Sequence, residues 1–380
     1  MVRLGDVCEV VSGSTPKSNM PDYWDGDVKW ITPAELSDDS YVIYDSVRHI
    51  TDLGVQKTGL KPFPAGTVIL SSRAPIGKTA IAGCEMYCNQ GFKNLICSEL
   101  IDNRYLYHYL SAKTDYLNSL GRGATFKEIS KSIVENIEIP LPSLDEQRKL
   151  ADQFEQINQL ISLRKIQISK LDELVKSRFI ELFGDPMTND SKWSVSTIGA
   201  QFDVTSGGTP ATGEKAYWDN GTIPWIGSNM CQDAILCEND GKFITEEGYA
   251  HSSAKWFYKG TVLVALVGAT IGKTALLRFD TTTNQNIAAI DVNGNAAFSS
   301  EFVFYHLQML YKKFMEIGSG KFKMANQGFI RQLPLICPPL ELQEQFAAFV
   351  EQTDKSKLAI QESLAELVTL KKALMQKYFG

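Results

Sequence analysis

Two copies of the segment Ile-Gly-Lys-Thr-Ala, which contain Lys78 and Lys273, resemble the end of a phosphate-binding loop. A nucleotide-binding loop of that kind needs a further glycine five positions before the glycine that precedes its lysine. Ser72 and Val267 occupy those two positions, so the sequence argues against nucleotide binding in either copy. Lys78 and Lys273 therefore either face a phosphate group from a β-hairpin or are ordinary lysines of a solvated turn.

Acidic residues near the N-terminus give a second, weaker signal. Asp22 and Asp27, followed by Lys29, imitate the set of carboxylates and lysine with which a nuclease would hold Mg²⁺. A later segment that matches this one has Lys215 and Thr222 in the same region and no such acids. We therefore interpret the acids of the first segment as turn residues.

Cysteine and histidine are the remaining residue types that could do chemistry. Seven cysteines and four histidines show no spacing typical of a zinc site and make no triad with a nucleophilic serine. His108 and His306 each follow a tyrosine in a predicted helix, which favours a satisfied structural role. The glycine-rich residues 318–320 are too few to indicate a cofactor. We predict free thiols, no metal, no cofactor and a cytoplasmic protein.

Composition limits the possible partners. The 380 residues predict two or three domains, and 44% hydrophobic with 22% charged residues is typical of a globular chain. No apolar run approaches the ~20 residues of a membrane span, and the start lacks a secretory signal, so no membrane contact is expected. Net charge is −6, and residues 1–143 hold 14 Lys+Arg against 17 Asp+Glu. Any surface for a polyanion must be a local basic patch.

The chain contains one long sequence pattern twice. Residues 3–36 return as residues 197–230, and six residues recur at a constant spacing of 194 positions: Gly13, Thr15, Pro16, Tyr23, Trp24 and Asp25. Further on, Asn89-Gln90 returns as Asn284-Gln285, and PLPSLDEQ (140–147) matches PPLELQEQ (338–345). Because order and spacing hold throughout, we predict two copies of one structural unit.

Each copy begins with a β-rich domain, predicted over residues 1–143 and 193–340. Short β-branched and aromatic runs separated by Gly, Pro and Asn predict mainly strands, with helices near residues 102–119 and 300–316.

A helical period follows each β-rich domain. Apolar residues recur every three or four positions in the first stretch at Ile157, Leu160, Ile161, Ile168, Leu171, Leu174, Val175 and Leu182. The C-terminal stretch repeats this at Phe346, Val350, Ile360, Leu364, Leu367, Leu374 and Tyr378. Long helices are predicted over 144–185 and 341–380, the first with a capping box of Ser143 and Glu146. We expect the two helices to pack against each other as in a coiled coil.

These elements predict an α+β protein. Two β-rich mixed domains form a tandem, pseudo-twofold repeat and are separated by two long, antiparallel, coiled-coil-like helices. Such symmetry matches the local twofold axes of B-DNA.

This layout resembles the specificity (S) subunits of type I restriction-modification systems. The motifs that carry the resemblance are GxTP, YWD, IGKTA, NQ and PLPSLDEQ, and the resemblance covers both copies. It implies that each β-rich domain is a target-recognition domain that reads one half of a split double-stranded DNA target in the major groove. It also implies two methyltransferase (M) subunits as partners, which methylate adenine, and possibly restriction/translocase (R) subunits. The chain has no Asn/Asp-Pro-Pro-aromatic motif, so we predict no enzymatic activity in this chain alone.

Three repeated regions fit DNA contact, because base edges need polar or planar side chains and phosphates need basic or hydroxyl groups. The predicted DNA-binding residues are Thr15, Lys17, Tyr23, Ser72, Arg73, Lys78, Arg122, Lys127, Thr209, Tyr217, Lys273, Lys321 and Lys323. Arg73 is suited to grip guanine in bidentate fashion, and the second copy has no arginine at this place. The two copies should therefore read different bases.

Two alternatives stay open for these regions. Trp24 and Trp218 are either part of the DNA surface or aromatic anchors of the core. The glycine-flanked basic loops around Arg122 and Lys321 either touch DNA or are exposed connectors. A different class of function, a non-catalytic coiled-coil adaptor that binds only protein partners, is the alternative for the whole chain.

Overall fold

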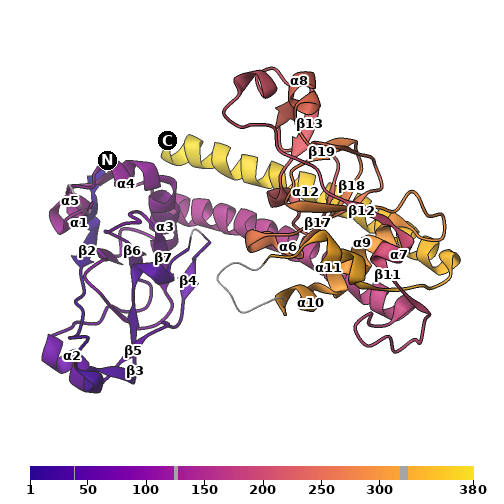
Figure 1. The fold of residues 1–380 in the computed structure, drawn as a ribbon. Helices are drawn as coiled ribbons and strands as arrows, with labels where there is room; N and C mark the ends of the chain where they lie inside the picture. Colours follow the sequence, from indigo (N-terminus) through magenta and orange to yellow (C-terminus); the bar gives the residue numbers. More distant parts are fainter. Residues whose placement is uncertain (38, 124–126, 317–323) are drawn as a thin grey trace. The chain divides into compact units, whose positions relative to one another are not determined.

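The computed structural model describes residues 1–37, 39–123, 127–316 and 324–380. The chain divides into two compact units, residues 1–165 with 362–380 and residues 166–361 (Figure 1). Two helices of 40 residues each, α6 (Leu144–Phe183) and α12 (Leu340–Phe379), contribute part of their length to both units. Lys321 and Lys323 lie outside the described residues.

Strands in the first unit form a five-stranded sheet of order β2-β9-β6-β7-β4, a three-stranded sheet β5-β3-β8 and the pair β1-β10. Short helices surround these sheets. The bounds, in chain order, are β1 Val2–Arg3, α1 Leu4–Val7, β2 Cys8–Val11, β3 Trp24–Ile31, β4 Val42–Ile43, β5 His49–Ile50, α2 Asp52–Thr58, β6 Val68–Leu70, β7 Thr79–Ala82, β8 Tyr87–Cys88, β9 Asn94–Cys97, α3 Asn103–Ala112, α4 Thr114–Ser119, α5 Lys131–Glu135 and β10 Glu138–Ile139.

The second unit repeats this order of elements with one additional strand, β16. Its main sheet has the order β12-β20-β17-β18-β14, beside a sheet β15-β13-β19-β16 and the pair β11-β21. The bounds are β11 Val195–Thr197, α7 Ile198–Gln201, β12 Asp203–Thr205, β13 Ile223–Ile226, β14 Ala234–Leu236, β15 Phe243–Ile244, α8 Glu246–Ala250, β16 Trp256–Phe257, β17 Val262–Ala265, β18 Thr274–Leu277, β19 Thr281–Thr283, β20 Ile287–Asp291, α9 Ser300–Met309, α10 Tyr311–Met315, α11 Gln327–Gln332 and β21 Pro334–Ile336.

The central strand of each main sheet is buried on both faces. In β6, Val68 and Leu70 pack into the cluster that includes α3, whereas Ile69 packs into a second cluster on the opposite face. In β17, Val262 faces one cluster and Leu263 the other. Because successive residues of a strand point to opposite faces, a strand covered on both sides reads as a continuous apolar run. This explains the repeated Gly-Thr-Val segments of the sequence.

Local signals at the ends of α6 act as the sequence predicts. Ser143 and Glu146 form the capping box: the Ser143 N–H donates to Glu146 Oε2 at 3.1 Å, and the Glu146 N–H donates to Ser143 Oγ at 3.4 Å. Gly184 ends the helix at a φ of 76° and donates its N–H to the Ile180 carbonyl at 2.8 Å. The predicted helices 102–119 and 300–316 are each two helices, separated at Lys113 and Leu310.

The long helices run antiparallel within each unit. In the second unit, Phe179 of α6 meets Phe346 of α12 at 5.4 Å between ring centroids, and Asp172 pairs with Lys357 at 2.6 Å. In the first unit, Phe154 of α6 stacks on Phe379 of α12 at 5.3 Å. Together with the tandem β-rich copies, these contacts confirm the predicted α+β fold.

Three of the apolar residues that were predicted to lie between the two long helices are instead at the edge of the helix contact. Leu160 and Leu174 of α6 are 44% and 49% exposed, because the seam passes through Ile157 and Val175. On α12, Tyr378 is 36% exposed and its neighbour Phe379 is buried. A period of 3.6 residues drifts against a strict heptad count, so a stripe read from sequence is accurate to about one neighbouring position. None of the helices in the described ranges combines the length and apolar character of a membrane span.

Candidate DNA interface

A threonine–glutamine pair stands at the same place in both copies. Thr15 Oγ1 donates to Gln90 Oε1 at 2.6 Å, and Thr209 Oγ1 donates to Gln285 Oε1 at the same distance of 2.6 Å. Both glutamines are exposed, and each uses its amide oxygen to accept from threonine, so the hydrogen-bond donor that remains on the side chain is the amide nitrogen. The repeated Asn-Gln segment was the only sequence signal for these glutamines, and sequence reasoning did not include them in the site.

Tryptophan side chains fix the turn that carries the threonine. Trp24 is buried, packs edge-on against Trp30 at 5.2 Å and donates its indole N–H to the Lys17 carbonyl at 3.2 Å. Trp218 makes the equivalent contacts with Trp225, at 5.2 Å, and with the Ala211 carbonyl, at 3.2 Å. Both tryptophans therefore act as core anchors, and the side chain of Lys17 is exposed at the turn that Trp24 holds.

The two tyrosines of this turn are half-buried. Tyr23 packs beside the Trp24 cluster, and Tyr217 stacks on His251 with ring centroids 5.9 Å apart. Part of each tyrosine remains at the surface.

Lys78 and Lys273 are half-buried, and the ammonium group of each has a partner within the protein. The Lys78 ammonium donates to the Leu36 carbonyl at 2.9 Å. Lys273 forms an ion pair with Asp233 at 2.5 Å and lies over the ring of Tyr311 at 4.7 Å. The sequence did not show these partners, because they lie far away along the chain, and contact of either lysine with DNA stays a prediction.

Two loops that were separate candidates in the sequence meet in the first copy. The chain after β6 and the chain that leads into α5 are joined by a hydrogen bond from the Ile129 N–H to the Ser72 carbonyl at 3.0 Å. The Ser72 N–H in turn donates to the Gly91 carbonyl at 2.8 Å. Three segments thus form one backbone cluster, which we call the three-segment site.

Charged side chains occupy the three-segment site of the first copy. Arg73 Nε donates to Glu128 Oε2 at 2.9 Å, and Lys93 Nζ contacts Glu128 Oε1 at 3.3 Å. Although partial burial opposes ionisation, these two hydrogen bonds hold the pKa of Glu128 below its ordinary value. Arg73 remains 44% exposed, whereas Ser72 is fully buried and its hydroxyl accepts from Lys93 at 3.3 Å. Ser72 is thus part of the scaffold, and sequence reasoning missed Lys93 and Glu128.

The second copy builds the same backbone cluster with uncharged side chains. The Ala325 N–H donates to the Leu266 carbonyl at 2.9 Å, and the Leu266 N–H donates to the Asn286 carbonyl at 2.8 Å. Val267 and Met324 stand where the first copy has Arg73 and Glu128. An open groove of about 560 Å³ lies here, and its lining includes Val267, Gln285, Asn286, Met324 and Asn326.

Arg122 and Lys127 are the exposed basic residues of the loop that enters the first three-segment site. The backbone of Arg122 pairs with Glu128 through two hydrogen bonds of 3.0 Å, which places both residues beside Arg73. Arg122 and Lys127 are both exposed. The matching Lys321 and Lys323 lie outside the described residues, so their contact with DNA stays a sequence-based prediction.

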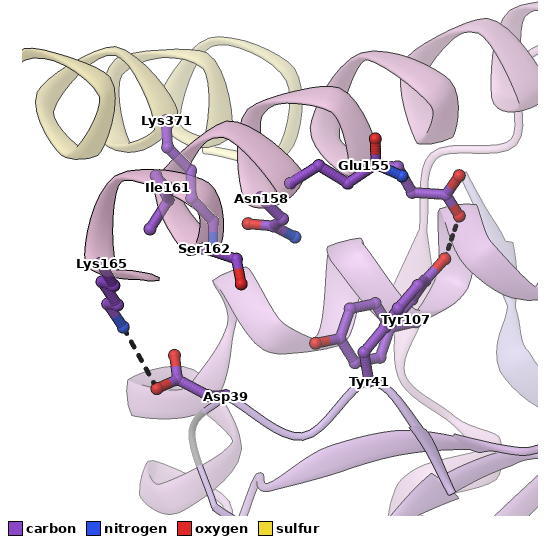
Figure 2. A pocket seen from close by; sticks show the side chains of 10 residues that line it. Asp39, Tyr41, Tyr107, Glu155, Asn158, Ile161, Ser162, Lys165 and Lys371 are labelled. Carbon is purple, nitrogen blue, oxygen red and sulfur yellow. Dashed lines mark hydrogen bonds and ion pairs between the residues drawn. The ribbon is translucent and has the colours of Figure 1, made fainter. Parts of the chain in front are cut away.

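A separate cavity of about 430 Å³ lies within the first unit, where its β-rich part meets α6 and α12 (Figure 2). Lys165 pairs with Asp39 across it at 3.3 Å, and Tyr41 donates its hydroxyl to Glu155. Burial lowers the pKa of Lys371, which also lines the cavity. The ion pair across this cavity joins the β-rich part of the first unit to α6.

Neither buried histidine has the surroundings of a catalytic base. Burial lowers the pKa of His108 to about 3 and that of His306 to about 4. His306 donates to the Pro334 carbonyl at 2.8 Å, whereas neither ring nitrogen of His108 has a hydrogen-bond partner among the described residues. Their roles are structural, although the expected satisfied state is wrong for His108. Within the described ranges, no three His, Cys, Asp or Glu residues gather as a metal site, and all seven cysteines are free thiols.

Sequence comparison places this architecture in a known family. The chain matches the family described as type I restriction modification DNA specificity domain over residues 1–173 and again over residues 190–370. The chain therefore belongs to the family of type I restriction-modification specificity subunits.

Individual relatives agree with this assignment. The type I restriction enzyme MjaIX specificity subunit of Methanocaldococcus jannaschii is 29% identical over 401 residues, which cover 99% of this chain and 91% of that protein. The EcoR124I/EcoR124II specificity subunit of Escherichia coli is 24% identical over 41% of this chain and 40% of its own length.

Solved structures share the fold. The S subunit of a type I system from M. genitalium matches with a TM-score of 0.59 at 16% identity and covers 100% of this chain and 95% of that one. A chain from a structural study of assembly and conformational transition in a type I restriction-modification system matches with a TM-score of 0.61 at 21% identity, over 100% and 96% of the two chains.

Proposed function

We propose that this chain recognises a bipartite double-stranded DNA target and directs adenine methyltransferase subunits to it. The domain of residues 1–143 reads one half of the target, and the domain of residues 193–340 reads the other. The long helices set the distance between the halves. Two M subunits, and in a restriction complex R subunits, supply the chemistry, so the chain itself is a non-catalytic reader.

One observation carries this proposal: the two copies share the backbone of the three-segment site but present different side chains on it. Arg73 and Glu128 in one copy correspond to Val267 and Met324 in the other. A scaffold kept constant while its exposed side chains vary is what two readers of different base sequences require, because base edges differ in donors, acceptors and methyl groups.

Charge supports a role for partners in firm binding. The first domain has more acidic than basic residues, with 14 Lys+Arg against 17 Asp+Glu in residues 1–143. Phosphate contact is the main source of affinity for DNA, so a subunit with this balance should bind weakly by itself. Apolar side chains exposed on the long helices, such as Leu163 at 54% and Leu358 at 58%, are available for contact with the partner subunits.

The proposal is tested by mapping the methylated adenines in the DNA of a host. A host that expresses this chain with its cognate M subunits should acquire adenine methylation at a split, two-part motif. Replacement of residues 1–143 by the equivalent domain of a relative should change one half of the motif and leave the other half and the spacing unchanged.

A matched exchange of residues 193–340 is the control, because it should change only the other half. Absence of a motif in a host whose M and S subunits co-purify would favour the alternative, a non-catalytic coiled-coil adaptor. Methylation by the purified chain with S-adenosylmethionine would contradict the non-catalytic assignment.

A further inference from the structure

We propose that the three-segment site is the specificity-determining element of each copy and that its side chains select the class of base pair. In the first copy, Arg73 and Glu128 fit a G·C pair. In the second copy, Val267, Asn286 and Met324 fit an A·T pair. This inference rests on the proposed DNA-reading function and names the residues and the base pairs for it.

The backbone equivalence makes the comparison between copies valid. In each copy a residue just beyond the central strand accepts one backbone hydrogen bond from the returning loop: Ser72 accepts from Ile129 at 3.0 Å, and Leu266 accepts from Ala325 at 2.9 Å. The next residue along the chain, Arg73 or Val267, is therefore held in the same backbone environment. The two sites therefore share the backbone hydrogen bonds of these residues and differ in the side chains at positions 73 and 267 and in the chain that follows, where the first copy has a cis Ala74-Pro75 bond and the second a short turn at Gly268–Thr270.

Arg73 has the geometry of a guanine reader. Its Nε is held by Glu128 at 2.9 Å, and the structure gives its two terminal nitrogens no partner among the described residues. Terminal guanidinium N–H groups are suited to the O6 and N7 acceptors of guanine, the commonest specific contact in the major groove. A carboxylate beside them complements the N4 amino group of cytosine. The pair as a whole therefore matches G·C.

Lys93 keeps this charged pair in place. Its side chain is only 9% exposed and its ammonium lies 3.3 Å from both Glu128 Oε1 and Ser72 Oγ. Lys93 thereby holds Glu128, and Glu128 holds Arg73, so little side-chain freedom is lost when DNA binds. The matching position of the second copy is Ala288, which is fully buried and uncharged. A positioning lysine is thus present only where there is a charged pair to position.

The second copy offers the complementary chemistry of an A·T pair. Met324 is 68% exposed and Val267 is half-buried, and both line the groove of about 560 Å³. Asn286 lines the same groove, and its side-chain amide has no hydrogen-bond partner among the described residues. An asparagine amide pairs with N6 and N7 of adenine, and apolar side chains contact the methyl group of thymine.

Crowding explains why the first copy carries no such amide. Gly91 stands at the position of Asn286, and a Cβ at Gly91 would lie 2.8 Å from Pro33 Cγ. The first site is therefore built around its charged pair alone. For the same reason, an exchange of side chains between copies should leave position 91 unchanged.

The experiment uses the complete complex of this chain with its cognate M subunits. Duplexes are selected from a library in which both half-sites are randomised, and the bound sequences are read. The wild-type complex should select one or more G·C positions in one half-site. In the Arg73→Val/Glu128→Met variant, one of these positions should lose its G·C preference by roughly 5- to 150-fold, and the other half-site should stay unchanged.

A reciprocal variant tests the second copy independently of the folding of the first. Val267→Arg/Met324→Glu should remove an A·T preference at one position of the other half-site. Arg73→Lys keeps the charge but loses the two-pronged contact, so it should lower the guanine preference while the salt dependence of binding remains as in the wild type.

The outcomes separate this inference from the proposed function. If the wild-type complex selects no motif, the DNA-reading function itself fails. If it selects a bipartite motif, but both exchanged variants keep the wild-type preferences or bind all sequences uniformly more weakly, the function stands and the assignment of the three-segment site is wrong.

Discussion

Gln147, in the first turn of α6, accepts a hydrogen bond from the Asp102 N–H at 2.8 Å and thereby ties the helix to the start of α3. Its amide nitrogen donates to the carbonyls of Leu100 and Pro142, at 3.1 and 2.9 Å. The second copy repeats all three bonds with Gln343, whose amide oxygen accepts from the Ser299 N–H at 3.0 Å. One buried glutamine thus fixes where each β-rich part joins its long helix.

Replacement of Gln343 by Ala should lower the free energy of unfolding of the second unit by about 2–4 kcal/mol. The change leaves a buried N–H and two carbonyls without partners, and each unsatisfied group costs roughly 1–3 kcal/mol, partly offset by relaxation. Urea unfolding followed by tryptophan fluorescence measures the effect. Gln345→Ala is the control, because Gln345 is exposed and should change stability by less than about 0.5 kcal/mol. Equal effects of the two changes would contradict this role of Gln343.

Both units should lose stability in acid because of their buried histidines. Burial lowers the pKa of His108 to about 3 and that of His306 to about 4 from an ordinary 6.5. At a pH between the pKa of the folded state and 6.5, each histidine is protonated in the unfolded chain and neutral in the folded chain. Stability is therefore full above pH 6.5 and falls as pH decreases, by about 2 kcal/mol for each histidine at pH 5.

Urea unfolding at pH 8 and pH 5 checks this expectation. The variants His108→Phe and His306→Phe remove the titrating group and keep an aromatic ring, so each should flatten the pH dependence of its own unit. A double variant that loses as much stability at pH 5 as the wild type would rule out the histidines as the cause.

Lys78 should affect stability and not DNA binding. Its ammonium is bonded to the Leu36 carbonyl, so Lys78→Ala leaves that carbonyl without its donor and should cost about 1–2 kcal/mol of unfolding free energy. The slope of log K against log salt for DNA binding by the complex should stay as in the wild type. A slope reduced by about 1 would show that the lysine reaches a phosphate instead.

Arg122 and Lys127 should behave in the opposite way. Both side chains are exposed beside the three-segment site, so Arg122→Ala/Lys127→Ala should weaken binding of all duplexes and lower the salt slope by about 1.8 without changing stability. Lys170→Ala on α6 is the control, since its ammonium is already paired with Glu173 at 2.7 Å. Changed base preference in the double variant would mean that these residues read bases.

Much of the fold could be predicted because its signals are local or periodic. The capping box of Ser143 and Glu146, the helix end at Gly184 and the two long helices depend on neighbours within a few positions. One alignment between the two copies was wrong. The match of residues 140–147 with residues 338–345 pairs Gln147 with Gln345, but the buried counterpart of Gln147 is Gln343. Identical letters near a helix start do not show which one faces the core, since burial depends on contacts with distant segments.

The candidate site was only partly predictable for the same reason. Arg73 and the loop of Arg122 were found separately, because basic residues between glycines are visible in a sequence. Their joint partner Glu128, 55 positions after Arg73, was not found. An acidic residue gives no local sign that it will orient an arginine.

The sequence by itself determined that this protein is built twice, that each copy is β-rich and ends in a long helix, and that the copies present different side chains. These properties follow from repetition and period, which need no knowledge of contacts. Only the tertiary structure decided which partners Lys78 and Lys273 have within the protein and that Ser72 is buried. It also decided that Arg73 and Glu128 form one charged pair where Val267 and Met324 form an apolar one. The energy of a side chain at a surface depends on partners that folding brings from distant parts of the chain.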